Sequence, residues 1–199
     1  GTLCREQGIF FLVDASQTLG ALPMDMEAWG IDGVIFPGYT SLLGPEGIGG
    51  LALSPRLEAL LPPFPEDPLN LPGIAGLGAA LDYLEERGQE LRERLGKLSR
   101  HLWARMKELD GEGLRVLGAD TPHHRAGLVS VEFTDRPNEE MVRRLAERYG
   151  IRCAWGMLGA PLACRTLGCS EQGVVRFSVS PFTTFGEIDW LEGAVEALL

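Results

Sequence analysis

The first quarter of the chain contains three short runs of apolar residues. They are IFFLVDA at residues 9–15, GVIFPG at 33–38 and IGGLALS at 48–54. Continuous apolar runs of this length are typical of strands that are buried on both faces of a parallel sheet. Ligands of such sheets bind at the carboxyl ends of the strands. We therefore expect Asp14, at the end of the first run, and the loop that begins at Gly38 to face one crevice.

The middle of the chain has the period of a long helix. From residue 72 to about residue 110, apolar residues recur at three- and four-residue spacing, with a break near Gly88. This pattern predicts a pair of helices, or one long kinked helix, that connects two halves. The segment before it, LPPFPEDPLNLPG at 61–73, is rich in proline and predicts an extended linker.

Strand and helix patterns alternate beyond residue 110. We expect strands at 114–118, 127–133 and 173–180, an amphipathic helix at 137–150 that stops at Gly150, and a closing helix capped by Thr183 or Thr184. The sequence thus predicts an α/β protein with a parallel sheet and the connecting helix in residues 1–110, and a small α+β domain in residues 111–199. The opening GTLCREQG predicts the last turn of a helix that stops at Gly8, as if the fold began earlier.

Composition and charge exclude some classes of partner. The chain has 199 residues, of which 45% are hydrophobic, and a net charge of −10 from 18 basic and 28 acidic side chains. Without a basic patch, this balance argues against binding to nucleic acid or to anionic membranes. We find no apolar run near the ~20 residues that cross a bilayer and no signal sequence, so we expect a cytoplasmic protein.

The four cysteines are too few for a disulfide scaffold of this size, so we expect reduced thiols. Cys153, Cys164 and Cys169 lie close together in the sequence, which raises the question of a zinc site. They form no Cys-x-x-Cys pair and have no histidine nearby. We therefore interpret them as small buried hydrophobic residues and predict no metal site.

Three longer stretches resemble the carboxyl-terminal half of the class V aminotransferases, most closely the cysteine desulfurases. They are FFLVDASQTLGALPMDMEAWGIDGVIFPGYTSLLGPEGIGGLALS at 10–54, NLPGIAGLGAALDYL at 70–84 and GVVRFSVSPFTTFGEID at 173–189. The resemblance implies a truncated form of this pyridoxal phosphate-dependent transferase fold, because members of the family are much longer.

The resemblance implies roles for three residues. Asp14 matches the aspartate that keeps the pyridine nitrogen of pyridoxal 5′-phosphate protonated, and Gln17 matches the side chain that hydrogen-bonds its phenolic oxygen. Arg176 matches the arginine that binds the substrate carboxylate. Taken alone, Asp14 could instead cap the following turn, and Arg176 could be a structural ion-pair partner.

The cofactor-binding loop departs from the family at its central position. Where the family has Ser-Gly-His-Lys, this chain has Pro37, Gly38, Tyr39 and Thr40. The lysine of that motif forms the Schiff base with the cofactor, and a threonine hydroxyl cannot form an imine. The chain has lysines only at 97 and 107, on the polar side of the long helical segment, so covalent cofactor binding is not expected.

Two further motifs of the family are also altered. In AWGMLGAP at 154–161, Ala154 stands at the motif's arginine, Leu158 at its histidine and Gly159 at the cysteine that carries the persulfide. In PEDP at 65–68, Pro68 stands at the threonine that reaches a neighbouring subunit's cofactor phosphate. We therefore predict no catalytic residue in this chain.

Three hypotheses follow from this pattern. The chain is a catalytically inactive relative, or one half of a pyridoxal phosphate-dependent enzyme that a partner chain completes, or a protein that binds pyridoxal or pyridoxamine phosphate noncovalently. A truncated sheet exposes a strand edge and an apolar face. We therefore expect a homodimer, or a partner chain that covers the sheet.

Overall fold

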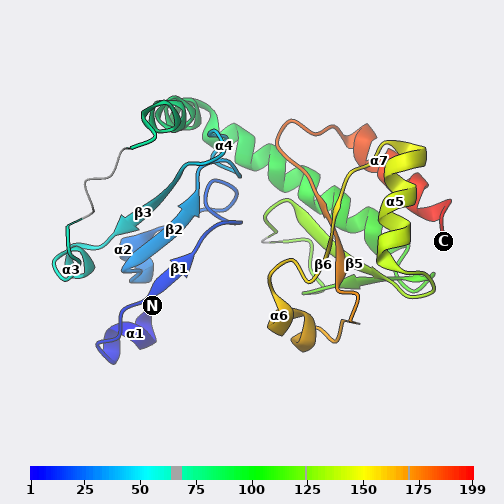
Figure 1. The fold of residues 1–199 in the computed structure, drawn as a ribbon, viewed down its shortest axis with the longest axis horizontal. Helices are drawn as coiled ribbons and strands as arrows, with labels where there is room; N and C mark the ends of the chain where they lie inside the picture. Colours follow the sequence, from blue (N-terminus) through cyan, green and yellow to red (C-terminus); the bar gives the residue numbers. More distant parts are fainter. Residues whose placement is uncertain (64–68, 124, 170) are drawn as a thin grey trace. The chain divides into compact units, whose positions relative to one another are not determined.

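The computed structural model describes residues 1–63, 69–123, 125–169 and 171–199, and its chain divides by packing into two compact units (Figure 1). The amino-terminal unit comprises residues 1–92 and the carboxyl-terminal unit residues 93–199. The boundary lies within one long helix, α4, Leu71–Glu108. The domain division at residue 110, expected from the sequence, stays a prediction.

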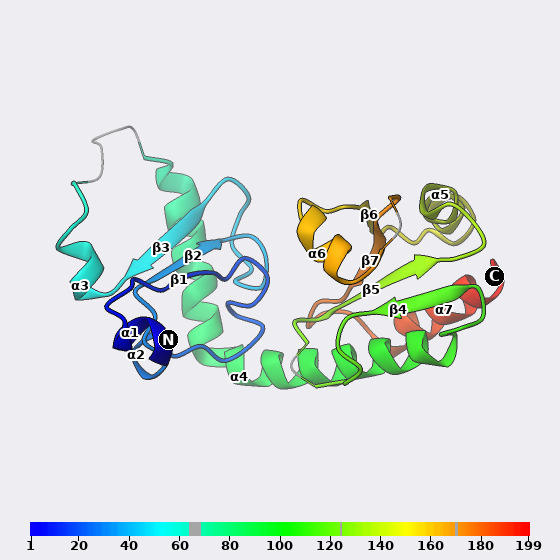
Figure 2. The same ribbon diagram turned by 90° about the horizontal axis from the view of Figure 1, so that it is seen from below.

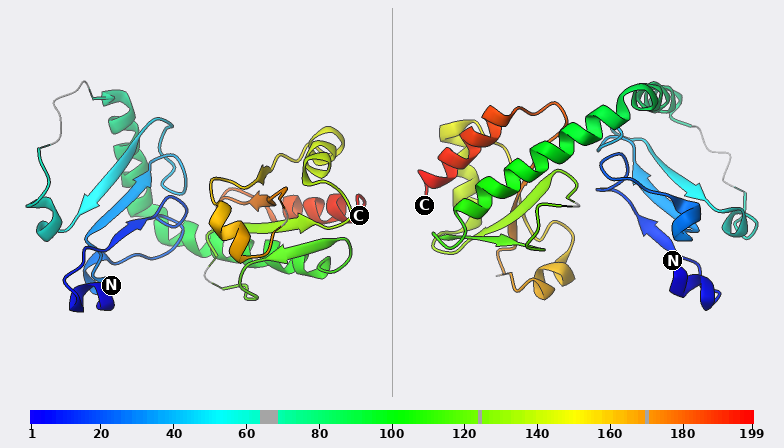
Figure 3. Two further views of the ribbon diagram at one scale, coloured as in Figure 1. Left: turned by 60° about the horizontal axis from the view of Figure 1, so that its bottom comes forward. Right: turned by 180° about the vertical axis from the view of Figure 1, so that it is seen from behind.

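The amino-terminal unit contains a three-stranded sheet in the order β1-β2-β3. Its elements are α1 (Thr2–Glu6), β1 (Leu12–Asp14), α2 (Met26–Trp29), β2 (Gly33–Pro37), β3 (Gly49–Leu53) and α3 (Pro55–Glu58). The short α2 lies against one face of the sheet (Figure 3), where Met26 packs with Val34 and Phe36. Helix α1 ends as expected, with Gly8 in the left-handed conformation.

The sheet of this unit is mixed, so the prediction of three parallel strands is wrong for the third. Strand β1 pairs with β2 in parallel, but β3 runs antiparallel to β2. The connection between β2 and β3 covers only residues 38–48, and parallel pairing needs a crossover of about a dozen residues or more, usually through a helix. The first run is also not buried on both faces, because the Leu12 side chain is 55% exposed.

Helix α4 is continuous from Leu71 to Glu108, without an interruption at Gly88. A single helix was one of the two expected alternatives. The helix begins at Leu71, within the end of the linker that was predicted at 61–73. It begins there because the Asn70 side chain accepts a hydrogen bond from the Gly73 amide at 3.0 Å and caps the helix. Residues 64–68 of that linker, including Pro68, lie outside the described residues.

The carboxyl-terminal unit is a four-stranded antiparallel sheet in the order β4-β5-β7-β6 with helices on both faces. Its elements after α4 are β4 (Leu114–Leu117), β5 (Leu128–Phe133), α5 (Asn138–Tyr149), β6 (Ala154–Gly156), α6 (Pro161–Thr166), β7 (Val174–Ser178) and α7 (Phe185–Glu196). Figure 2 shows α6 on one side of this sheet and α4 and α7 on the other.

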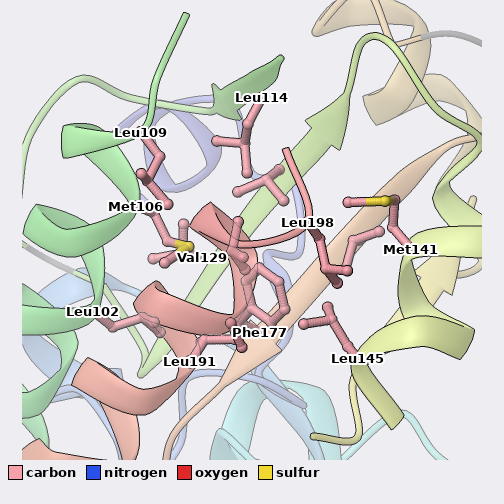
Figure 4. Close-up of a cluster of buried hydrophobic side chains, with 14 of the residues drawn as sticks. Leu102, Met106, Leu109, Leu114, Val129, Met141, Leu145, Phe177, Leu191 and Leu198 are labelled. Atoms are coloured by element: carbon pink, nitrogen blue, oxygen red, sulfur yellow. The ribbon is translucent and has the colours of Figure 1, made fainter. Parts of the chain in front are cut away.

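The core of this unit lies between the sheet and helices α4, α5 and α7. Leu102 and Met106 from α4 lie beside Leu191 from α7 and beside Val129 and Phe177 from the sheet (Figure 4), and all five are nearly or fully buried. The predicted helix ends are confirmed. Gly150 ends α5 in the left-handed conformation, and Thr184 caps α7 in a capping box with Glu187.

Candidate functional site

Asp14 is the last residue of β1, and its side chain is exposed. The Ala15 amide still donates to the carbonyl oxygen of Ile35 at 2.9 Å, which fixes the strand end against β2. The Asp14 carboxylate accepts hydrogen bonds from the Ser16 hydroxyl and, at 2.9 Å, from the Ser16 amide. These two bonds lower the pKa of Asp14, so the group is an anion at neutral pH.

Gln17 lies in the turn that follows Asp14, and its side chain is exposed. The turn is closed by the amides of Thr18 and Leu19, which both donate to the carbonyl oxygen of Ala15 at 3.0 Å. The structure thus places Asp14 and Gln17 in one short turn at the end of β1. Ser16 was not predicted as part of the site, although Asp-x-Ser is a spacing at which an aspartate side chain accepts from the backbone two residues on.

The loop after β2 is packed tightly against this turn. Gly38 donates to the carbonyl oxygen of Ile48 at 2.7 Å and accepts from the Gly44 amide at 2.8 Å. A side chain at Gly38 would meet Ile48 Cγ2 at 2.9 Å and Leu77 Cδ1 at 3.2 Å. The glycine at this position is therefore explained by close packing of the loop.

Thr40 joins the loop to the turn after Asp14. Its Oγ1 donates a hydrogen bond to the carbonyl oxygen of Ser16 at 3.1 Å. The neighbouring Tyr39 side chain is 52% exposed. The structure therefore places Asp14, Gln17 and Thr40 close to Ser16 within the amino-terminal unit, and the crevice expected at the strand ends stays a prediction.

Arg176 lies in the middle of β7, between Ser130 of β5 and Ala154 of β6. Its Nε is buried and has no hydrogen-bond partner within the described ranges of the chain. Leaving a buried charged donor without a partner is costly, so this atom is available to an acceptor such as a carboxylate. Arg176 belongs to the carboxyl-terminal unit, so its assembly with Asp14 and Gln17 into one site stays a prediction.

The segment aligned with the persulfide loop lies between β6 and α6. Gly159 is exposed and has a φ of 75°, and a Cβ built there would meet no atom within 4 Å. The preceding Leu158 also has a positive φ of 50°. The position offers space to a side chain, but the glycine present supplies no reacting group.

The two lysines of the chain both lie in α4 within the carboxyl-terminal unit. Lys107 forms ion pairs with Asp110 at 2.5 Å and Asp120 at 3.3 Å, and these partners raise its pKa. A lysine with a raised pKa is a poorer nucleophile toward an aldehyde, because only the neutral amine attacks. Lys97 is exposed.

The cysteines are free thiols. Burial raises the pKa of Cys153 to about 11, so this thiol is unreactive at neutral pH. In the part of the chain that the structure describes, no three histidine, cysteine, aspartate or glutamate side chains are grouped so that they could hold a metal ion. None of the described helices is both long and apolar enough for a membrane span.

Sequence comparison finds a match to the aminotransferase class-V family model over residues 1–66 and 68–191. The cysteine desulfurase IscS of Escherichia coli is 30% identical over 206 residues, which cover 96% of this chain and 50% of that protein. A mitochondrial cysteine desulfurase of Arthroderma benhamiae is 28% identical over 98% of this chain and 41% of its own length. The chain thus spans about half the length of the curated relatives it matches.

Structural comparison agrees with this match. The apo structure of a cysteine desulfurase from Thermococcus onnurineus NA1 superposes with a TM-score of 0.86 and 23% sequence identity, over 99% of this chain and 54% of that one. The cysteine desulfurase CsdA from Escherichia coli superposes with a TM-score of 0.79 and 25% identity. Because the family model covers nearly the whole chain, this protein belongs to the class V aminotransferase family.

Proposed function

We propose that this chain is a cysteine desulfurase-like member of the family that does not perform covalent pyridoxal phosphate chemistry. The observation that carries the proposal is Thr40. It stands at the Schiff-base position of the family motif, and its hydroxyl binds the carbonyl oxygen of Ser16. This contact stabilises the loop, and the side chain has no amine to offer the cofactor. The residues present do not fit a covalently held cofactor.

Other substitutions support the same proposal. Gly159 stands where the persulfide cysteine would be, and neither lysine of the chain lies in the unit that contains Asp14. Asp14 and Gln17 remain, and both are exposed at the end of β1. These two residues suit noncovalent contact with a pyridine ring, because an anionic carboxylate hydrogen-bonds a protonated ring nitrogen.

We expect no borohydride-fixed adduct when the purified chain is titrated with pyridoxal 5′-phosphate. The test follows visible absorbance before and after reduction and then maps the labelled peptide. Saturable binding without fixation identifies a noncovalent site, and Asp14→Asn should then weaken it while Asp25→Asn, an exposed helix cap of the same unit, should not. A saturable adduct on Lys97 or Lys107 would overturn the proposal.

A second candidate function is that of one half of a larger enzyme, and the exposed face of the β1-β2-β3 sheet favours it. Ile35 is 50% exposed and Leu51 is 40% exposed, and they are direct neighbours across the β2-β3 pair. Asp14 is the neighbour of Ile35 across the β1-β2 pair, and Leu12 lies two residues earlier on the same face. The apolar face therefore also presents the proposed cofactor-binding carboxylate.

A face of this kind is normally covered in a folded protein. We propose that a partner chain, or a second copy of this chain, covers it and packs beside Asp14. Even then the covering polypeptide would have to supply the lysine, because the Schiff-base position is Thr40. This requirement makes the enzymatic alternative the weaker candidate.

Substitution of Ile35 tests whether the face is an interface. We expect the isolated chain to self-associate and Ile35→Glu to shift the assembly toward the monomer in sedimentation velocity, because a charge cannot be buried there without a partner. Leu60→Glu, at a leucine that is 68% exposed outside the sheet, is the control and should leave the assembly unchanged. Equal assembly of both variants would rule out this face as the interface.

A further inference from the structure

The short helix α6 ends in a turn that folds the chain back on itself. Gly168 follows the helix with a φ of 65°, in the left-handed region that favours glycine. The Gly168 amide donates to the carbonyl oxygen of Arg165 at 3.1 Å, and the Cys169 amide donates to that of Cys164 at 2.9 Å. This pair of bonds defines a Schellman motif, which brings the residue after the glycine over the last turn of the helix.

The motif places the two cysteines at one apolar cluster. Cys164 is 6% exposed and packs with Leu117 and Val174 of the sheet, and Cys169 packs on the same cluster. The Cys169 side chain thus packs against the same apolar cluster as the Cys164 thiol. A hydrophobic contact between these two positions commonly accompanies the motif. Packing alone therefore explains why both positions are apolar, but not why both carry sulfur.

Arg115 of β4 holds the turn in place. Its guanidinium donates to the carbonyl oxygens of Gly168 at 2.7 Å and Leu167 at 3.3 Å, and it pairs with the buried carboxylate of Glu132 at 2.5 Å. The turn is therefore fixed to the sheet from one side and by its own backbone bonds from the other. A disulfide requires Cα atoms roughly 4.4–6.8 Å apart. The bond from the Cys169 amide to the carbonyl oxygen of Cys164, at 2.9 Å, holds the two residues close together.

We propose that Cys164 and Cys169 form a reversible disulfide, with low-molecular-weight disulfides as the class of oxidant. The site is independent of the cofactor-binding residues Asp14 and Gln17, which lie in the other unit. No third ligand joins the pair among the described residues, so a dithiol reaction is favoured over metal binding.

The reaction is a pair of thiol–disulfide exchanges. Burial also raises the pKa of the half-buried Cys169 thiol, so mildly alkaline pH is needed to form its thiolate. This thiolate attacks one sulfur of the oxidant, which forms a mixed disulfide and releases one small thiol. Cys164 then loses its proton and attacks the Cys169 sulfur, which forms the protein disulfide and releases the second small thiol. The protein loses two protons and two electrons, and the oxidant gains them.

The test requires a variant from which the two other cysteines have been removed. Cys153 is unreactive because burial raises its pKa to about 11, and Cys4 lies in the amino-terminal unit. The double variant Cys4→Ser/Cys153→Ser keeps only the proposed pair. We would incubate it with mixtures of oxidised and reduced glutathione at mildly alkaline pH, block remaining thiols and measure the intact mass.

The expected product has lost two hydrogens and carries no glutathione and no blocking group. Adding Cys164→Ser to this background should stop the reaction at one glutathione on Cys169, because nothing then resolves the mixed disulfide. A stable glutathione adduct while both cysteines are present, or two blocked thiols at every redox ratio, would overturn the proposal.

A glycine substitution tests whether the turn is responsible. Gly168→Ala adds strain at a positive φ and opens the fold-back, so we expect the equilibrium constant for disulfide formation to fall roughly tenfold. Gly150→Ala is the matched control, since Gly150 has a φ of 69°, follows α5 and, like Gly168, has no atom within 4 Å of a built Cβ. Equal effects of the two variants would show that the motif does not position the thiols.

Discussion

Leu102→Ala should destabilise the carboxyl-terminal unit by about 3 kcal/mol, because it leaves a cavity in the core that the surrounding side chains can fill only in part. Leu102 is fully buried in α4 and lies among side chains from the sheet and from α7 (Figure 4). The expected result is a lower urea midpoint for this unit, and faster hydrogen exchange at the amides of Val129 and Val131.

Leu162→Ala makes the same chemical change at a leucine that is 70% exposed in α6. We expect it to change the free energy of unfolding by less than about 0.5 kcal/mol, as is usual for surface substitutions. If Leu102→Ala also cost less than about 1 kcal/mol, α4 would not be part of the core of this unit. Hydrogen exchange at the amides of β2 reports on the amino-terminal unit, so it separates the unfolding of that unit from the unfolding of the carboxyl-terminal unit.

The carboxyl-terminal unit could be predicted well from the sequence because its signals are local. Gly150 ends α5, Thr184 and Glu187 begin α7, and the apolar residues of β5 alternate with its polar ones. Each of these signals acts within a few residues of the chain. The two short elements between α5 and β7, which are β6 and α6, had no such signal and were not predicted.

Strand β6 exists because of its neighbour. Its three residues pair with β7, with Trp155 opposite Val175, and such pairing is not encoded in the three residues themselves. The predicted parallel direction of β3 was wrong for a related reason. An apolar run such as IGGLALS indicates a strand but not the direction of its partner, which here is set by the short connection after β2.

The residues of the candidate site stay a prediction, and the contacts among them could not be foreseen from the sequence. Strand order predicted that Asp14 and the loop after Gly38 face one edge, since the carboxyl end of β1 and the end of β2 lie at the same edge. Gln17 was added by the resemblance to the family. The hydrogen bond from Thr40 to Ser16 and the unpartnered Nε of Arg176 depend on side-chain placement across elements. Sequence pattern does not determine placement of that kind.

Asn138→Ala should cost the same unit roughly 2–4 kcal/mol, since it leaves two buried backbone groups without a partner. Asn138 is fully buried at the start of α5. Its Oδ1 accepts from the Phe133 amide at 3.0 Å, and its Nδ2 donates to the carbonyl oxygen of Gly173 at 3.0 Å. One side chain thus joins the end of β5 to the start of β7.

Two further variants separate the stability lost with the two hydrogen bonds from any change in helix propensity. Asn138→Asp keeps the acceptor for the Phe133 amide but turns an oxygen toward the Gly173 carbonyl oxygen, so we expect it to be nearly as damaging at neutral pH. Asn70→Ala removes an exposed cap of α4 that makes one hydrogen bond, and we expect a loss of about 1 kcal/mol or less in the amino-terminal unit.

Chemical unfolding of all three variants, together with hydrogen exchange at Phe133, measures these effects. If Asn138→Ala were no worse than Asn70→Ala, ordered water would be replacing both lost bonds, and the connection between β5 and β7 would not depend on this side chain. If the predicted order holds, Asn138 also fixes the start of β7. The position of Arg176, two residues beyond Val174, would then depend on Asn138, to which no role in binding is assigned.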